Sequence, residues 1–394
     1  MKLKGLRVLI VADVSAEFVH GGAERMLYHH IRACCDAGAH VTVLTRQPKD
    51  GAELLFKLEH GVVEHRLPFG GDKGWRGLYQ LCKEADMWWQ LHQQFDVVLA
   101  EQPFVMWALM RAGCKLPRVQ VCHSFAFEEY ATRHGLDWNL KHRMVTMMMR
   151  RLEASVYTSA KSHVVLSQFM QQRLHDFFNI AQARIHIAAG GIDTFPLSWN
   201  QRSHTRKTIW GEQSDAPLIV TLRNLVPRTG VDLLIQAAAI VHVDRPDVRW
   251  LVMGSGSLLE PLKRLTHTLG MDDVVEMAGF VSEKEVHQRL WTADLFMLPT
   301  RSLEGFGLVT LEANAHGLPV VATPVGANPD VVGWHALNKV ADDATPEALA
   351  KAVLQSLNNF PQEVEREGLA KETVAHFAWS KHDTAVVDAL KRLE

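Results

Sequence analysis

"DLFMLPTRSLEGFGLVTLEANAHGLPVVATPV", residues 294–325, places a buried strand, a glycine turn, a helix and a second buried strand in succession. The helical pattern "LVTLEANAHG" ends at Gly317, and Pro319 follows two residues later, which is a common way for a helix to stop. Two strands joined by a crossover helix form a βαβ unit, and such units build parallel sheets. This stretch therefore predicts an α/β fold.

The same alternation recurs along the chain. Its β-branched runs are apolar throughout, as expected for strands covered on both faces. The runs are "LRVLIVAD", "HVTVLTR", "FDVVLAE", "RVQVCHS", "SHVVLSQ", "RIHIAAG", "PLIVTLRN", "RWLVMGSG", "VVEMAGFV", "DLFMLPT" and "PVVATPV". One polar stretch rich in Gly and Pro, residues 190–217, interrupts the series and is the best linker candidate. With 394 residues, two α/β domains of similar size are expected.

The composition excludes several classes of protein. Apolar residues make up 47% and charged residues 22%, which is typical of a soluble globular chain. The net charge of −2 argues against a dedicated nucleic-acid binder. An odd number of cysteines, without metal-type spacing, indicates free thiols in a reducing cytoplasm. The apolar run near the start stops at Asp13 without a cleavage site, so it favours a buried strand over a signal peptide. No apolar run is long enough for a membrane span.

Two glutamates in the quoted stretch raise the first functional question. Glu304 falls on the glycine turn and Glu312 about one turn inside the helix. Eight helical residues span roughly 12 Å, too far for an acid–base pair but suitable for gripping both ends of one elongated ligand. Backbone amides at the helix start between them form a natural phosphate seat. Carboxylates suit sugar hydroxyls, so the pattern indicates a sugar nucleotide; two solvated surface charges are the alternative.

"EGFGLVTLE", followed by "GLPVVATPVGANPDVV", resembles the E-x7-E signature of the family 4 retaining glycosyltransferases. The resemblance covers nearly the whole chain in order. It implies the GT-B fold, in which two Rossmann-like, doubly wound parallel-sheet domains face each other across a cleft. The implied parts are an acceptor-side domain at 1–195, a nucleotide-sugar-binding domain at 196–375, and a C-terminal helix, 376–394, that crosses back to the first domain.

The resemblance assigns roles to the glycine turn. Glu304 would contact the donor sugar close to the reacting carbon, and Glu312 would hold the ribose hydroxyls. The amides of Phe306, Gly307 and Leu308 would hold the sugar and the diphosphate.

Two further loops are expected at the diphosphate. Gly21 and Gly22, in "HGGAERML", suggest a tight turn opening a helix where backbone can approach a phosphate, although many strand–helix turns need glycine without any ligand. In "TLRNLVPRTG" the family's Arg and Lys positions are occupied by Asn224 and Thr229, while basic residues stand one step earlier. A departing diphosphate needs cationic compensation, so Arg223 is the first choice and Arg228 the second. Solvent-exposed loop arginines are the alternative.

Four more positions follow strands. By the resemblance to the family, Gly254 and the backbone of Val281 would border the nucleotide. Without any nucleotide site, an ordinary glycine turn and an ordinary strand end would give the same sequence pattern. His123 ends an N-terminal strand where the family has a histidine, and it would contact the donor sugar or line the reaction centre. Glu101, at another strand end, could orient an acceptor.

Residues 138–161 carry five basic residues against one acid, mixed with methionines. This pattern is typical of attachment to an anionic membrane surface, but a packed helix with a basic outer face is favoured. The membrane alternative stays open because family members that act on lipid-linked acceptors carry basic helices in this region.

The resulting hypothesis is a hexosyltransferase that moves a sugar from a nucleoside diphosphate donor to an acceptor hydroxyl with retention. A UDP-sugar is favoured as donor and GDP-mannose comes next; bacterial glycan, glycolipid or lipopolysaccharide synthesis is the expected setting, in the cytoplasm. No D-x-D stands at the expected strand end and no cluster has ligand spacing, so neither a metal nor another cofactor is expected. A front-face and a covalent mechanism both stay open. An epimerase or phosphorylase on this fold, or a non-catalytic donor-binding scaffold, are the alternative functions.

Overall fold

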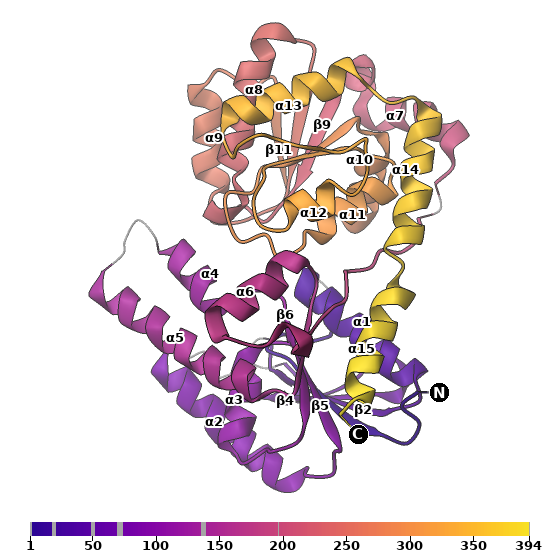
Figure 1. Ribbon diagram of the computed structural model, residues 1–394. Helices are drawn as coiled ribbons and strands as arrows, with labels where there is room; N and C mark the ends of the chain where they lie inside the picture. Colours follow the sequence, from indigo (N-terminus) through magenta and orange to yellow (C-terminus); the bar gives the residue numbers. More distant parts are fainter. Residues whose placement is uncertain are drawn as a thin grey trace. The chain divides into compact units, whose positions relative to one another are not determined.

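The computed structural model describes residues 2–17, 21–48, 52–68, 74–134, 139–195 and 197–393. The chain divides into two compact units (Figure 1). Unit 1 is Met1–Gly190 with Trp379–Glu394, and unit 2 is Gly191–Ala378. The sequence had placed these divisions at 195 and 376. Each unit is built on its own sheet, and the predicted α/β class with two largely parallel sheets is confirmed.

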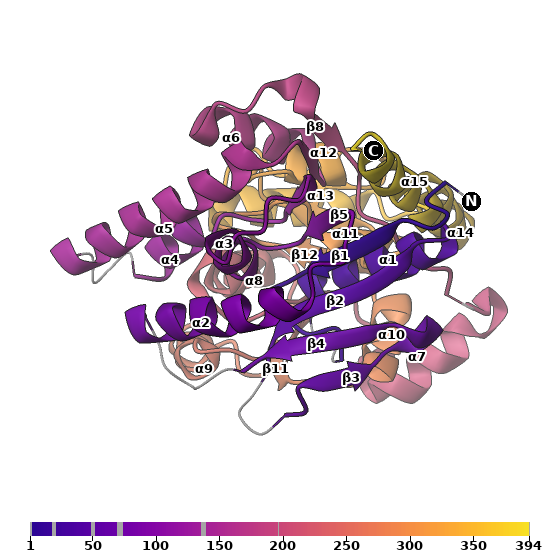
Figure 2. The same ribbon diagram turned by 90° about the horizontal axis from the view of Figure 1, so that it is seen from below.

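Unit 1 contains an eight-stranded sheet in the order β3-β4-β2-β1-β5-β6-β7-β8. Its strands are β1 (Arg7–Val11), β2 (His40–Arg46), β3 (Leu55–Lys57), β4 (Val63–Leu67), β5 (Val97–Ala100), β6 (Arg118–Cys122), β7 (Ser162–Val165) and β8 (Ile185–Ile187). The strands run parallel except β3, which pairs antiparallel with β4. Figure 2 shows β3, β4, β2 and β1 side by side at this edge.

Helices cover both faces of this sheet. They are α1 (Gly22–Asp36), α2 (Trp75–Leu91), α3 (Pro103–Arg111), α4 (Ala126–Arg133), α5 (Leu140–Ser159), α6 (Gln168–Phe178) and α15 (Trp379–Lys391). Because side chains alternate along a strand, β1 supplies both cores. Val8 and Ile10 pack in the cluster that includes α1 and α15, whereas Leu9 and Val11 pack in the cluster that includes α2, α3 and α5. The apolar runs without alternation are thereby explained.

Unit 2 contains a six-stranded parallel sheet in the order β11-β10-β9-β12-β13-β14. Its strands are β9 (Leu218–Leu222), β10 (Arg249–Met253), β11 (Val275–Gly279), β12 (Leu295–Leu298), β13 (Val320–Ala322) and β14 (Lys339–Val340). Its helices are α7 (Arg202–Trp210), α8 (Val231–Asp244), α9 (Leu259–Thr268), α10 (Glu283–Thr292), α11 (Leu308–Ala315), α12 (Asn328–Val332), α13 (Pro346–Asn358) and α14 (Glu363–His376).

The parallel strands of unit 2 end at one common edge of the sheet. The strands β11, β10, β9 and β12 are neighbours in that order, so the loops that follow them meet there. This is the edge at which open α/β sheets bind ligands. Within the described parts of the chain, the helices are all too short or too polar to cross a bilayer.

Candidate functional site

The turn between β12 and α11 holds Glu304 in a strained, buried setting. Leu303 has a positive φ of 61°, which is unusual for a residue other than glycine or asparagine. Glu304 is 7% exposed, and its carbonyl accepts a hydrogen bond from the Ala327 amide at 2.9 Å. Gly326 makes this contact possible, because a Cβ at residue 326 would lie 2.2 Å from the Glu304 carbonyl oxygen. The loop after β13 therefore fixes the position of the turn that carries Glu304.

The Glu304 carboxylate is held at one of its two oxygens. Its Oε2 accepts hydrogen bonds from Arg223 Nη2 and from Thr300 Oγ1, both at 2.9 Å. Arg223 follows β9, which neighbours β12, and this adjacency brings the arginine to the turn. Among the residues that the structure describes, no group donates a hydrogen bond to the other oxygen, Oε1. The turn thus presents a buried, charge-balanced carboxylate with one acceptor oxygen available.

The amides predicted to form a phosphate seat lie at the start of α11. Gly307 is the N-cap residue with a φ of 82°, and the amides of Leu308 and Val309 begin the helix without a preceding turn to bond to. Phe306 is buried, with its ring 6.2 Å from that of Phe377, so its side chain belongs to the core and only its backbone is available at the turn. The use of its amide for the sugar and the diphosphate stays a prediction.

Glu312 lies on α11 and is half-buried. Its carbonyl oxygen accepts a hydrogen bond from His316 Nδ1 at 2.6 Å. Burial lowers the pKa of His316 to about 4, so this ring is neutral and its Nδ1 carries the proton. Residue 312 is therefore held in place through its backbone.

The loop after β9 contains the two departures from the family pattern. Thr229, at the position of the family's lysine, is buried, and its Oγ1 donates to the carbonyls of Asn224 and Val226 at 2.8 Å, which closes the loop on itself. Arg228 Nη1 lies 3.4 Å from the Leu303 carbonyl, so it stands beside the turn rather than at the carboxylate. The structure brings Arg223, not Arg228, to Glu304.

Gly254 supports this loop from β10. Its φ is 129°, and a Cβ there would lie 1.9 Å from the Arg223 carbonyl oxygen. The glycine is thus required by the close approach of two backbones. Val281 is half-buried at the carboxyl end of β11, on the same sheet edge. Both residues lie where the sequence predicted them, but for Gly254 the structural requirement alone accounts for the residue type.

Unit 1 presents a second set of predicted residues at the ends of β5 and β6. His123 Nε2 lies 3.0 Å from Glu101 Oε2. The His123 side chain is 14% exposed, whereas that of Glu101 is 0% exposed. The sequence suggested that Glu101 could orient an acceptor, but its burial leaves the carboxylate no exposed surface for a direct contact. Glu101 faces imidazole rings, and it can influence a ligand only through His123.

The glycine pair before α1 differs from the expected tight turn. Gly21 is the N-cap residue with an extended backbone, φ −150° and ψ −175°, which any residue can adopt. Gly22 begins the helix, and both glycines are exposed. The pair opens a helix N-terminus as predicted, but the conformation of Gly21 does not demand glycine.

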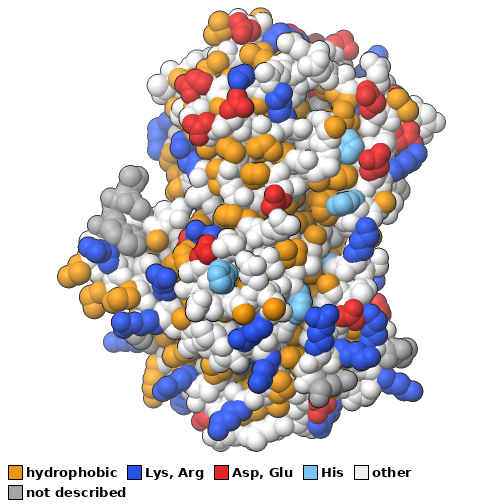
Figure 3. All heavy atoms as spheres, viewed as in Figure 1, with side chains coloured by type: hydrophobic (Ala, Val, Ile, Leu, Met, Phe, Trp, Pro, Cys, Tyr) orange, Lys and Arg blue, Asp and Glu red, His pale blue; other side chains and the backbone are white. Residues whose placement is uncertain are grey.

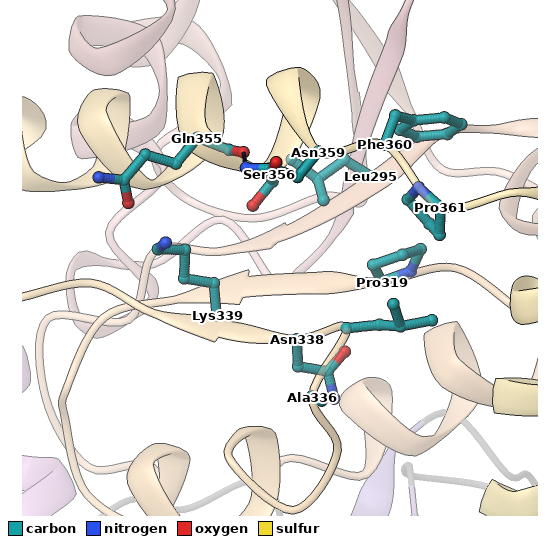
Figure 4. Close-up of a pocket in the computed structure, with 11 residues that line it drawn as sticks. Leu295, Pro319, Ala336, Asn338, Lys339, Gln355, Ser356, Asn359, Phe360 and Pro361 are labelled. Carbon is teal, nitrogen blue, oxygen red and sulfur yellow. Dashed lines mark hydrogen bonds between the residues drawn. The ribbon is translucent and has the colours of Figure 1, made fainter.

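Figure 4 shows a cavity of about 310 Å³ in unit 2 that is unrelated to this site. Leu295, Pro319 and Lys339 line it at the amino ends of β12, β13 and β14. It therefore lies at the edge of the sheet opposite to Glu304. Within the described ranges, no cluster of three His, Cys, Asp or Glu side chains is placed to hold a metal ion.

Sequence reasoning missed three residues around Glu304, namely Thr300, Leu303 and Gly326. Thr300 completes the Glu304 hydrogen bonds, Leu303 carries the strained backbone, and Gly326 sets the turn. The glycine in "TPVGANP" was a visible signal. A threonine and a leucine in a loop carried none.

Comparisons with known proteins agree with this architecture. Residues 203–371 match the family model "Glycosyl transferases group 1", and residues 20–194 match "Glycosyltransferase Family 4". The structure is similar to that of sucrose-phosphate synthase from Thermosynechococcus elongatus, with a TM-score of 0.82, 18% identity, and coverage of 98% of this chain and 99% of that one. This likeness establishes the GT-B fold.

Two relatives stand out by sequence. One is the GDP-mannose-dependent alpha-(1-6)-phosphatidylinositol monomannoside mannosyltransferase of Mycobacterium tuberculosis, 29% identical over 57% of this chain and 60% of the relative's length. The other is the D-inositol 3-phosphate glycosyltransferase of Segniliparus rotundus, 28% identical over 87% of this chain and 78% of the relative. One family match falls on each unit, and together with the glycine turn and the shared fold they show that the chain belongs to family 4 of the glycosyltransferases.

Proposed function

We propose that the protein is a retaining glycosyltransferase that moves a sugar from a nucleoside diphosphate sugar to an acceptor hydroxyl. The observation that carries this proposal is the Glu304 carboxylate, with Oε2 held by Arg223 and Thr300 and Oε1 available. An ionised carboxylate accepts hydrogen bonds only, so Oε1 suits a sugar hydroxyl. The adjacent helix N-terminus suits the anionic diphosphate.

Each residue of the turn then has a distinct role. Glu304 holds a donor hydroxyl close to the reacting carbon, and the amides of Phe306, Gly307 and Leu308 bind the sugar and the diphosphate. Arg223 neutralises Glu304 in the free protein and lies next to the leaving group once the donor is bound. Positive charge and helix N-terminal amides stabilise a departing diphosphate in the transition state.

The remaining predicted residues complete the donor and acceptor sides. Glu312 binds the ribose, and the Val281 backbone binds the base. His123 lines the reaction centre, and Glu101 acts behind it. The name of the mycobacterial relative moves GDP-mannose ahead of the UDP-sugars as the first donor to test. Its acceptor is a glycolipid, which favours a glycolipid or a glycan as acceptor here as well.

A membrane-facing surface on α5 fits such an acceptor. Leu140, Met144 and Met147 follow one another at helical spacing and are 72%, 58% and 50% exposed. Lys141, Arg143, Arg150 and Arg151 on the same helix are exposed. In Figure 3, orange and blue spheres adjoin where α5 lies in Figure 1. An exposed apolar stripe flanked by basic residues is the kind of surface that binds anionic lipids, and it supports the proposal that the protein works at the inner face of a membrane. Trp138, which was part of the predicted segment, lies outside the described residues.

A donor screen followed by one matched pair of variants tests the enzymatic proposal. GDP-mannose and UDP-sugars are added singly, and the bound donor is identified by the rise of the thermal midpoint. We expect Glu304→Gln to reduce sugar transfer from that donor by about 10²-fold or more, because a charged acceptor at the reacting carbon is lost. Glu276→Gln, at an exposed glutamate of β11, should leave transfer unchanged.

Two results would contradict the proposal. One is conversion of the donor to an epimer in the absence of any acceptor, which indicates an epimerase. The other concerns Glu304→Gln. If this variant keeps full transfer activity, or keeps its biological role without any transfer, the turn is a binding scaffold.

A further inference from the structure

A chain of buried polar side chains runs behind His123 in unit 1. Glu101 Oε2 lies 3.0 Å from His123 Nε2, and Glu101 Oε1 lies 2.6 Å from His30 Nδ1 on α1. His30 Nε2 lies 2.7 Å from His382 Nε2 on α15. At the far end, His382 Nδ1 faces the carbonyl oxygens of residues 188 and 189 at 3.1 and 3.0 Å. His30, Glu101 and His382 are buried, and only His123 reaches solvent.

The hydrogen-bond partners fix where the protons lie. Carbonyl oxygens only accept, so His382 Nδ1 must carry a proton, and a neutral His382 then accepts at Nε2. His30 must therefore donate from Nε2. An ionised Glu101 also only accepts, so His30 must donate from Nδ1 as well. His30 is thus protonated on both nitrogens, a buried imidazolium paired with the Glu101 carboxylate.

The pKa shifts of the neighbouring groups follow once His30 carries a positive charge. Burial opposes ionisation of Glu101, but His30 and His123 outweigh it, and the pKa of Glu101 falls to about 2. Burial, followed by the charge of His30, lowers the pKa of His382 to about 3, which keeps it neutral. Burial, followed by the charges of Cys35, Glu101 and Asp383, raises the pKa of the Cys34 thiol, one turn along α1 from His30.

The same logic extends to His123. Glu101 Oε2 accepts, so His123 carries its proton on Nε2. Within the described part of the chain, no group bonds to His123 Nδ1, and the ring is partly exposed. The outer nitrogen of a neutral His123 is then an acceptor for a ligand hydroxyl.

We propose that His30, Glu101 and His382 are positioning residues that hold His123 in the Nε2-protonated tautomer with Nδ1 offered to the ligand. The C-terminal helix α15 thereby takes part in orienting His123. The proton assignment rests on unit 1 alone, whereas its effect on catalysis rests on the proposed function. The alternative is a purely structural staple between α1 and α15.

The proton assignment is tested by NMR on the full chain with ¹⁵N-labelled histidine. His30→Gln and His123→Asn identify the two rings by the loss of their signals. At pH 7 we expect two protonated nitrogens for His30 and a proton on Nε2 alone for His123. A neutral His30, or a His123 protonated on Nδ1, overturns the proposal, whether or not the protein transfers sugar.

The catalytic effect is tested with a matched pair on α1. His29 precedes His30, is also buried, and stacks on Trp379 of α15 with ring centroids 3.5 Å apart, but it is outside the hydrogen-bonded chain. We expect His30→Gln to lower kcat by about 10- to 100-fold, as loss of an outer-shell partner does at metal sites, with KM within about threefold. His29→Gln should leave kcat within about twofold.

Equal kcat losses in the two variants would show a structural staple and overturn the positioning role. If His30→Gln fails to fold, His382→Asn serves instead, because its amide can still donate to the two carbonyls while the acceptor for His30 is removed. Unchanged His123 signals in His382→Asn would also overturn the proposal. If neither variant folds, the tautomer of His123 in the unsubstituted chain, assigned with His123→Asn, decides.

Discussion

Replacing Gly326 by alanine tests whether Glu304 must stand where the structure puts it. The added Cβ would lie 2.2 Å from the Glu304 carbonyl oxygen and 3.1 Å from the Glu304 Cβ. Non-bonded carbon and oxygen atoms need roughly 3.2 Å, so the turn must retreat by about 1 Å. A displacement of this size at a reacting centre costs about 10²-fold in rate.

Gly270 provides a control with the same backbone conformation. Its φ is 67°, against 64° for Gly326, but a Cβ at residue 270 meets no atom within 4 Å. Both alanines carry the strain of a left-handed residue, about 1–2 kcal/mol, partly offset by a less flexible unfolded chain. Gly270→Ala should therefore cost about 1 kcal/mol of unfolding free energy, and Gly326→Ala about 1–3 kcal/mol more for the clash.

The assay is release of nucleoside diphosphate from the donor identified by thermal shift, measured below the unfolding transition of both variants. We expect Gly326→Ala to lose about 10²-fold in kcat and Gly270→Ala to stay within about twofold. If both variants keep full activity although Gly326→Ala is the less stable, the position of Glu304 is not what catalysis depends on.

Three further outcomes are expected. Arg223→Met leaves a buried carboxylate without its cation, so unfolding of unit 2 should become about 3 kcal/mol easier in denaturant titrations and transfer should fall about 10²-fold; an unchanged midpoint contradicts the ion pair. Burial raises the pKa of Glu153 from 4.5 to about 7, so the protonated group contributes roughly 3 kcal/mol of stability below pH 4.5, and this contribution is lost as the pH rises to about 7. In Glu153→Gln the thermal midpoint should therefore depend less on pH between these values. The same pH dependence in the variant and the unsubstituted protein refutes this. The double variant Leu140→Ser/Met144→Ser should no longer sediment with anionic vesicles, whereas Val243→Ser, at an 82% exposed valine of α8, should still do so. Equal vesicle binding by the unsubstituted protein and both variants excludes the α5 surface as the membrane contact.

The parts of the site that the sequence could predict are those carried by short-range patterns. Glu304, Gly307 and the helix start lie within one strand–turn–helix segment, where residue order alone fixes their neighbourhood. Arg223 was predicted from the need for a cation near a diphosphate; the structure shows it beside Glu304, and its role at a diphosphate stays a prediction. The alternation of apolar runs and helices likewise predicted both sheets.

The parts that could not be predicted depend on contacts between distant segments. His30 and His382 are 352 residues apart, and no local pattern announces that their rings meet. Glu101 was expected to orient an acceptor because it follows a strand, but its side chain is fully buried and its carboxylate contacts His30 of the distant helix α1. The requirement for glycine at 254 comes from the Arg223 backbone in another loop, which a single sequence does not display.

The membership of α15 in unit 1 has a consequence for biosynthesis. Val386, Val387 and Leu390 fill the same core as β1 and α1, yet they are translated after the whole of unit 2. At about 5–20 residues per second, the ribosome needs roughly 10 to 40 s to make unit 2. Throughout that interval the part of unit 1 already made lacks α15, and the hydrophobic core residues that α15 covers stay exposed. Unit 2 can therefore finish folding before unit 1, and the exposed core residues are the segment that chaperones would have to shield.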